Sequence, residues 1–138
     1  MNILSIDYGN QHIGLAIADS KLKIVFPYKV LEYQGDNFLF DSLQEIVKKE
    51  KIEKIIVGRP MGMQNNLTDQ TKITDEFVQK LKKAIELPIE IFDERLTSKM
   101  ALSLSKGGEG NIHSGSAMII LQDYLDKIKM DRVLRSIL

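Results

Sequence analysis

Near the start of the chain, apolar residues fall in short runs that each have the length of a β-strand. The runs cover Asn2–Asp7, Ile13–Ala18 and Ile24–Glu32, and the connection between the first two contains glycine and asparagine. Strands that follow one another so closely are typical of an antiparallel meander. Pro27 lies inside the third run. It predicts an edge strand or a bulge there, because proline has no backbone N–H to donate.

The hydrophobic period then changes to that of helices alternating with strands. Leu39, Leu43 and Ile46 share one face of a predicted helix over 36–51. The segment 68–85 shows the same period, with its lysines on the outer face. The other expected elements are strands at Lys54–Gly58 and Ile89–Phe92, a short helix over 97–105, a glycine-rich loop, and a last helix over 114–129.

This order of elements predicts an α/β fold. Strands and helices alternate as β-β-β-α-β-α-β-α, which is a meander followed by βα units in one mixed five-stranded sheet flanked by helices. The 138 residues have the size of one ordinary domain. We therefore expect a single domain over 1–138.

Composition narrows the class of protein. Hydrophobic residues make up 43% and charged residues 28% of the chain, as in soluble globular proteins. The chain has no cysteine, which excludes disulfides and thiolate metal sites. No apolar run reaches the roughly 18 residues that span a bilayer, so we expect a cytoplasmic protein without a membrane partner. The 19 basic and 19 acidic side chains cancel, so any phosphate-binding surface must come from local clustering.

Polar residues that could carry chemistry follow the predicted parallel strands. Asp7 ends the first strand, Arg59 follows the fourth, and Asp93 and Glu94 end the fifth. Ligands of such sheets bind outside the carboxyl ends of the strands. Carboxylates that converge there repel one another, and a hard divalent cation relieves this repulsion. His113 begins the last helix, where free backbone amides favour anions.

Simpler interpretations of each residue stay open at this point. A lone aspartate after a strand is more often a turn or cap residue, and the Asp93–Glu94 pair could form a solvated turn with Arg95. Successive strand residues point to opposite faces, so only one of the two acids is expected to reach Asp7. His113 alone is more often a cap or surface histidine.

Taken together, four segments of the chain resemble the YqgF/RuvX family, described as pre-16S ribosomal RNA nucleases and as Holliday-junction-resolvase-like proteins. They are "SIDYGNQHIGLAIAD", "IIVGRPMGM", "FDERLTS" and "SAMIILQDYLD". The resemblance covers nearly the whole chain. It implies an RNase H-like fold, a nuclease that uses one or two Mg²⁺ or Mn²⁺ ions, and a role in maturing the 5′ end of small-subunit ribosomal RNA. By position, Asp7 and Glu94 match the first and second acids of the family.

The third acid of the family is replaced in this chain. At its place, shortly before the last helix, stands His113, which we expect to be the third metal ligand or a base for the attacking water. A neutral histidine suits magnesium less well than a carboxylate, which predicts weaker magnesium binding and a preference for manganese. The expected phosphate contacts are Arg59, Arg95 and Lys99. They are fewer than in the family, whose loops usually carry more basic residues.

The resemblance leaves rival functions. A catalytically weak or inactive RNA- or ribosome-binding module would keep the fold without a working metal site, and a Holliday-junction-resolving DNA nuclease would share the site. An actin-like or sugar-kinase-like ATPase needs two such domains and is disfavoured by the length. The expected partners are pre-ribosomal RNA or branched DNA and the small-subunit precursor, with the protein acting as a monomer or weak homodimer.

Overall fold

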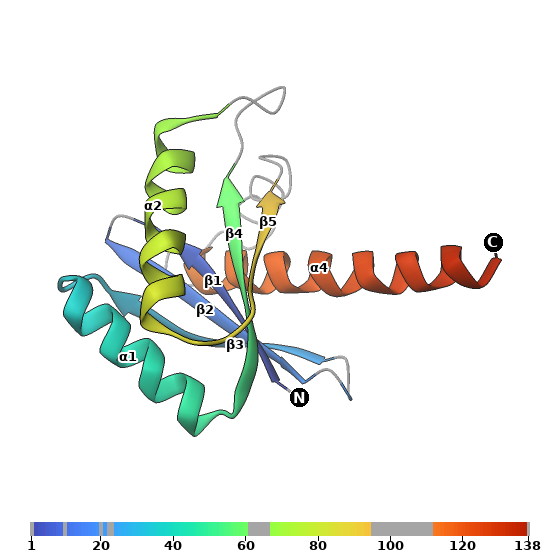
Figure 1. Cartoon of the computed structure of the whole chain (residues 1–138), viewed down its shortest axis with the longest axis horizontal. Helices are drawn as coiled ribbons and strands as arrows, with labels where there is room; N and C mark the ends of the chain where they lie inside the picture. Colours follow the sequence, from blue (N-terminus) through green and yellow to red (C-terminus); the bar gives the residue numbers. More distant parts are fainter. Residues whose placement is uncertain are drawn as a thin grey trace.

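The computed structural model describes residues 2–9, 11–19, 21, 24–60, 67–94 and 112–137 of the chain. Its elements alternate in the expected order along the chain (Figure 1). They are β1 (Asn2–Tyr8), β2 (His12–Asp19), β3 (Ile24–Glu32), α1 (Asp36–Lys49), β4 (Ile52–Pro60), α2 (Asp69–Ala84), β5 (Ile89–Glu94) and α4 (Ile112–Ile137).

The five strands form one mixed sheet in the order β3-β2-β1-β4-β5. β1, β2 and β3 pair antiparallel, as the predicted meander requires. β4 pairs parallel to β1, and β5 pairs parallel to β4. The carboxyl ends of β1, β4 and β5 therefore meet at one end of the sheet, where the sequence places its candidate residues.

Pro27 lies in an edge strand, as predicted. β3 is the outermost strand on one side of the sheet, and its pairing with β2 shifts register between Leu15 and Ala16, beside Pro27. The proline is tolerated because an edge strand leaves half of its N–H groups outside the ladder.

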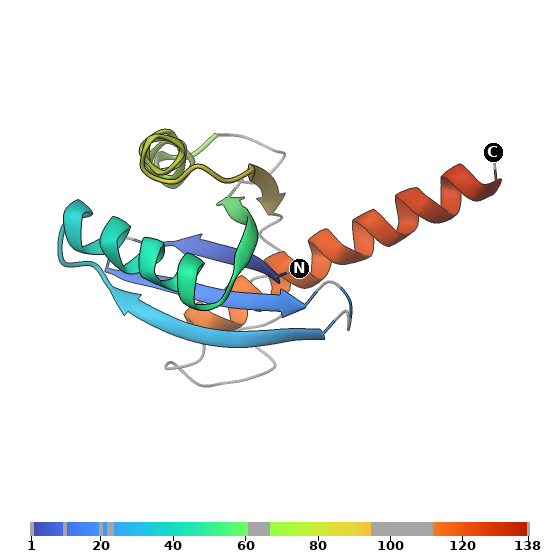
Figure 2. The same ribbon diagram turned by 60° about the horizontal axis from the view of Figure 1, so that its bottom comes forward.

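Helices cover both faces of the sheet. α1 and α2 lie on one face, and α4 crosses the other (Figure 2). Under α4, β2 presents Ala16 and Ala18, which are fully buried and small enough to let the helix approach closely. The core beneath α1 and α2 is larger and includes Leu4, Ile6, Ile13, Leu15, Leu39, Leu43, Ile55, Val57, Phe77, Val78 and Leu81.

Only the first half of α4 packs on the sheet. Its inward stripe of Ala117, Ile120, Leu121 and Tyr124 is buried and Ile128 is partly buried, but the next inward position, Asp131, is charged. A charged side chain cannot be buried without a partner. The second half of the helix therefore extends past the sheet, as Figure 1 shows.

The second half of α4 has a different apolar stripe. Met130, Val133, Leu134 and Ile137 are 44–73% exposed, and at about 100° per residue they lie roughly half a turn from the inward stripe. In the described structure they do not dock on the domain.

Some predicted boundaries were wrong. α4 ends at Ile137 rather than Lys129, and β4 extends two residues beyond each end of the predicted strand Lys54–Gly58. Helix ends and strand ends depend on the neighbours that pair with them, which the hydrophobic period does not report. The predicted short helix over 97–105 and the glycine-rich loop lie outside the described residues. Among the described helices, none is both long and apolar enough to span a membrane.

The division of α4 predicts unequal stability effects. Ile120→Ala should lower the free energy of unfolding by about 2–5 kcal/mol, because it empties a fully buried position. Leu134→Ala, at an exposed position of the same helix, should change it by less than about 0.5 kcal/mol. Urea denaturation of both variants measures the difference. Equal losses would show that the projecting half packs on the domain in solution.

Candidate active site

Asp7 is buried near the carboxyl end of the central strand. Asp7 is 8% exposed, and its backbone pairs with Gly14 of the antiparallel neighbour β2. Because side chains alternate along a strand, Asp7 lies on the same face as Ile3 and Ser5, which is the face that α4 covers. A carboxylate in this place is desolvated and needs compensating contacts.

The start of α4 is held at the Asp7 end of the sheet by a buried hydrogen bond. Ser5 Oγ, in a fully buried residue, donates to the backbone oxygen of Ala117 over 2.7 Å. Farther along α4, Tyr124 contacts Lys54, which lies beside Ile3 at the opposite end of β1. The helix therefore runs away from Asp7. Residue 113, one turn before Ala117, belongs to the turn that begins at the Asp7 end.

The backbone also brings residue 94 to this end of the sheet. Glu94 is the last residue of β5 and pairs in register with Pro60, two positions beyond the level of Asp7. Positions 90, 92 and 94 share one face of β5, and Phe92 packs against the core under α4. The side chains of Glu94 and His113 lie outside the described structure. Their roles as metal ligands therefore stay predictions.

Asp93 lies on the other face of the sheet, as expected from strand alternation. It is 3.6 Å from Nη1 of Arg59. Arg59 donates from Nε and Nη2 to the two carboxylate oxygens of Asp75 on α2, at 2.8 and 3.0 Å. The structure thus brings Arg59 and Asp7 to the same end of the sheet but to opposite faces. Sequence reasoning missed Asp75, because nothing in the periodicity of α2 distinguishes it from the other polar residues of that helix.

The beginning of α2 is fixed at the same end of the sheet. Gln70 Nε2 donates to the backbone oxygen of Tyr8 over 3.1 Å, directly after Asp7. Thr71 Oγ1 donates to the backbone oxygen of Pro60, and Thr68 caps the helix by accepting from the Thr71 amide. These bonds join α2 to the ends of β1 and β4, so the backbone around Asp7 is held from both faces.

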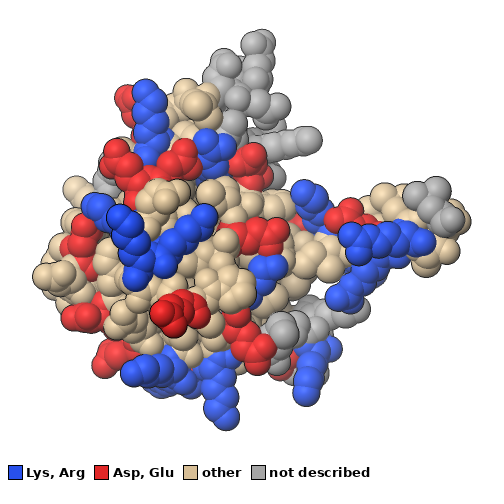
Figure 3. All heavy atoms as spheres, viewed as in Figure 1, with Lys and Arg blue, Asp and Glu red and all other residues tan. Residues whose placement is uncertain are grey.

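The described residues do not by themselves complete a metal site. Among them, no group of at least three His, Cys, Asp or Glu side chains is arranged to hold an ion. Asp7 supplies the hard oxygen that Mg²⁺ prefers. The remaining predicted ligands, Glu94 and His113, are those whose side chains are not described, and Arg95 and Lys99 lie wholly outside the described residues. The face shown in Figure 3 has its lysines and arginines dispersed among acids.

A second polar cluster, which the sequence did not indicate, holds α4 at the other end of the sheet. Lys54 Nζ is 2.6 Å from Glu90 Oε2 and donates to the hydroxyl of Tyr124. The same Tyr124 hydroxyl donates to Glu90 over 2.9 Å. The hydrogen bond from Lys54 is the main reason that the pKa of Glu90 lies below its ordinary value.

Known proteins are similar to this chain over most of its length. A family model described as "RuvX: Holliday junction resolvase" matches residues 1–127. The chain belongs to the RuvX family. A Maridesulfovibrio salexigens protein named "Putative pre-16S rRNA nuclease" is 36% identical over 132 residues, which covers 91% of this chain and 98% of that protein. A Rickettsia africae protein with the same name is 34% identical, with 92% and 87% covered.

Solved structures confirm the fold of this RuvX protein. Thermus thermophilus RuvC in complex with a Holliday junction superposes with a TM-score of 0.63 over 91% of this chain and 93% of RuvC, at 13% identity. The fowlpox virus Holliday junction resolvase gives a TM-score of 0.54 at 11% identity, with 92% and 99% covered. At such low identity the likeness shows the fold alone, which is the predicted RNase H-like fold.

The Lys54–Glu90 pair predicts a pH-dependent contribution to stability. A glutamate whose pKa is lowered by folding stabilises the protein above the pKa of the unfolded chain, and this stabilisation is lost as the pH falls through the folded pKa. Glu90→Gln should therefore lower the free energy of unfolding by up to about 1 kcal/mol near pH 7, since the pair is partly exposed. The difference from wild type should be smaller at pH 3, below the ordinary glutamate pKa of 4.5, and should go on shrinking as the pH falls.

Urea denaturation at both pH values measures this effect. Glu45→Gln, at an exposed position on α1, is the matched control. A pH-independent difference between Glu90→Gln and wild type would contradict the assignment of the effect to this charge.

Proposed function

We propose that this protein is a divalent-metal-dependent endonuclease for structured RNA, and that its reaction is 5′-end maturation of pre-16S ribosomal RNA. Membership of a nuclease family and the names of its relatives support this proposal. The observation that carries it is the buried carboxylate of Asp7, at the carboxyl end of the central strand and under the beginning of α4. We further propose that residues 1–138 act as one domain in the cytoplasm.

The donor set fits a hard cation. In this proposal Asp7 and Glu94 provide carboxylate oxygens, and His113 provides a ring nitrogen as third ligand. One or two bound Mg²⁺ or Mn²⁺ ions would supply stabilisation of negative charge on the phosphate and a lowered pKa for the attacking water. Because Asp7 is fixed on the central strand, its carboxylate would hold a bound ion in one position. Ser5 and Gln70 act as its positioning residues through Ala117 and Tyr8.

His113 has an alternative role within the same reaction. Its neutral imidazole could accept the proton of the attacking water at a ring nitrogen instead of binding metal. In either role the site carries one negative charge less than a site with the third acid of the family. Magnesium depends more on carboxylate charge than manganese does, so we propose that manganese supports the reaction better.

Few basic side chains are available to bind the phosphates of the substrate. We propose that Arg95 and Lys99 contact phosphates beside the ligands. Arg59 can do so only by exchanging Asp75 and Asp93 for a phosphate, because both now neutralise it. Such sparse contacts imply weak, salt-sensitive binding. We propose a monomer or weak homodimer that meets its RNA within a small-subunit precursor, where other proteins supply further contacts.

Branched DNA is the second candidate substrate. The description of the family model names a Holliday junction resolvase, and this is the observation that favours it. The same metal site would serve either polymer, since the choice depends on contacts to the 2′-hydroxyl. A module that binds RNA without cutting it is the third possibility and differs in needing no metal.

Substitution of Asp7 tests the proposal directly. Asp7→Asn keeps the volume but removes the ligand charge, so cleavage of a precursor 16S fragment should fall by about a hundredfold or more with either metal. Gel assays with Mg²⁺, Mn²⁺ or chelator, on this RNA and on a four-way DNA junction, measure it. Asp41→Asn on α1 is the control. RNA that stays intact with every metal yet binds in chelator would establish the binding module instead.

Substitution of His113 tests the third ligand. His113→Asp restores the charge that Mg²⁺ needs, so the ratio of Mn²⁺-supported to Mg²⁺-supported cleavage should fall at least severalfold. Calorimetric titration with Mg²⁺ should show tighter binding. Asn37→Asp, which adds the same charge on α1, controls for net charge. An unchanged ratio together with unchanged Mg²⁺ affinity would remove His113 from the metal site.

A further inference from the structure

β5 forms the edge of the sheet opposite β3. It pairs with β4 on one side, and its other side pairs with no strand among the described residues. The backbone N–H and C=O groups on such an edge are a template for another strand. Ile91 of β5 is 39% exposed, so the apolar surface of the sheet also continues to this edge.

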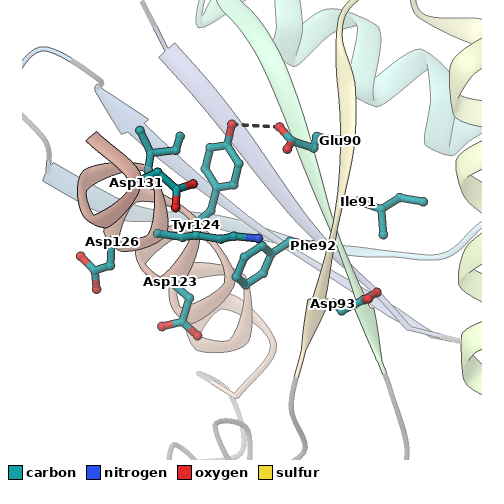
Figure 4. Close-up of a pocket in the computed structure, with 10 residues that line it drawn as sticks. Glu90, Ile91, Phe92, Asp93, Asp123, Tyr124, Asp126 and Asp131 are labelled. Atoms are coloured by element: carbon teal, nitrogen blue, oxygen red, sulfur yellow. Dashed lines mark hydrogen bonds between the residues drawn. The ribbon is translucent and has the colours of Figure 1, made fainter. Parts of the chain in front are cut away.

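A groove of about 740 Å³ lies between β5 and α4 (Figure 4). Its apolar part is formed by Ile91, Phe92, Tyr124 and Ile128. Phe92 and Tyr124 pack edge to face, with their ring centres 6.2 Å apart. The groove thus has an aromatic floor at β5 and opens where α4 leaves the sheet.

The polar lining of the groove is strongly acidic. Its charged residues are Glu90, Asp93, Asp123, Asp126, Asp131 and Lys127. Lys54 neutralises Glu90, and Arg59 lies near Asp93. Lys127 is the only cation of the lining, against three carboxylates from α4, and it lies over the ring of Phe92. Burial and the neighbouring Asp126 raise the pKa of Asp123, in keeping with crowded negative charge.

The spacing of helix and sheet leaves room for one more strand. β5 lies against Tyr124, which donates a hydrogen bond to Glu90 and packs on the ring of Phe92. α4 runs across the strands and continues past β5 (Figure 1). A strand added to β5 lies about 4.8 Å farther out, and one helical turn advances about 5.4 Å. The added strand would therefore lie about one turn beyond Tyr124, over Ile128, with Asp131 almost one turn farther along α4.

We propose that this groove binds an extended, lysine- and arginine-rich segment of another protein, which pairs with β5 as a sixth strand. Backbone hydrogen bonds to β5 provide part of the affinity. Basic side chains on one face of the segment meet Asp123 and Asp131 of α4, while the apolar side chains on its other face cover Ile91. The docking site does not depend on the nuclease activity, since it uses none of the proposed catalytic residues.

Charge favours this occupant over others. A nucleic acid backbone is repelled by the same carboxylates, so the substrate is directed away from this face. A second copy pairing edge to edge through β5 would bring two acidic grooves together. A basic segment is the occupant whose charge the groove complements.

A synthetic peptide tests the proposal on the full chain. The probe is a fluorescein-labelled peptide of alternating Arg or Lys and Val, with blocked ends, and its binding is followed by fluorescence anisotropy. The double variant Asp123→Asn, Asp131→Asn should weaken binding at least tenfold. The matched control, Asp41→Asn with Glu45→Gln, removes two exposed carboxylates from α1 and should change binding less than twofold. Circular dichroism confirms that both variants fold.

Two further peptides separate strand pairing from plain charge attraction. One has N-methyl groups on its odd backbone amides and the other on its even amides. A strand donates to β5 from alternate residues, so only one of the two should lose binding. The proposal is overturned if both methylated peptides bind as well as the parent or if the double variant binds normally. It is also overturned if wild-type protein dimerises and the variant does not, or if the variant loses RNA binding instead.

Discussion

The packing of α4 across one face of the sheet is the constraint on which the rest of the structure depends. Ala16 and Ala18 make that face shallow enough for the helix, and the buried bond from Ser5 to Ala117 sets where along β1 the helix lies. At the other end of the sheet, Tyr124 is held by Lys54 and Glu90. With both ends fixed, the first turn of α4 can only be at the carboxyl end of β1.

This constraint explains why the two faces of the sheet have different uses. The face under α4 holds Asp7 and the position of Glu94, so the candidate metal ligands belong to it. The opposite face holds Arg59 in ion pairs that connect β4, β5 and α2. Strand alternation alone separates these groups, because adjacent residues such as Asp93 and Glu94 cannot share a face.

A neutral chain can still act on a polyanion if its charges are unevenly distributed. The edge formed by β5 and α4 is acidic, whereas the proposed phosphate contacts follow the carboxyl ends of β4 and β5. In the proposed function, such a division would orient a nucleic acid on the surface without any large basic patch. It also leaves the acidic edge available to a basic protein partner.

The sequence by itself determined the order of the elements, the mixed sheet, an edge strand or bulge at Pro27 and the presence of Asp7 at a strand end. These follow from local periodicity and turn chemistry, which act over a few residues. Only the tertiary structure decided the partners: Asp75 for Arg59, Ala117 for Ser5, and Glu90 for Lys54 and Tyr124. It also decided that α4 continues beyond the sheet. The later residues of this helix have no sheet beneath them to pack on, and only the arrangement of the layers shows where the sheet ends. Contacts between residues far apart in the chain depend on how the layers pack, and no short pattern encodes that packing.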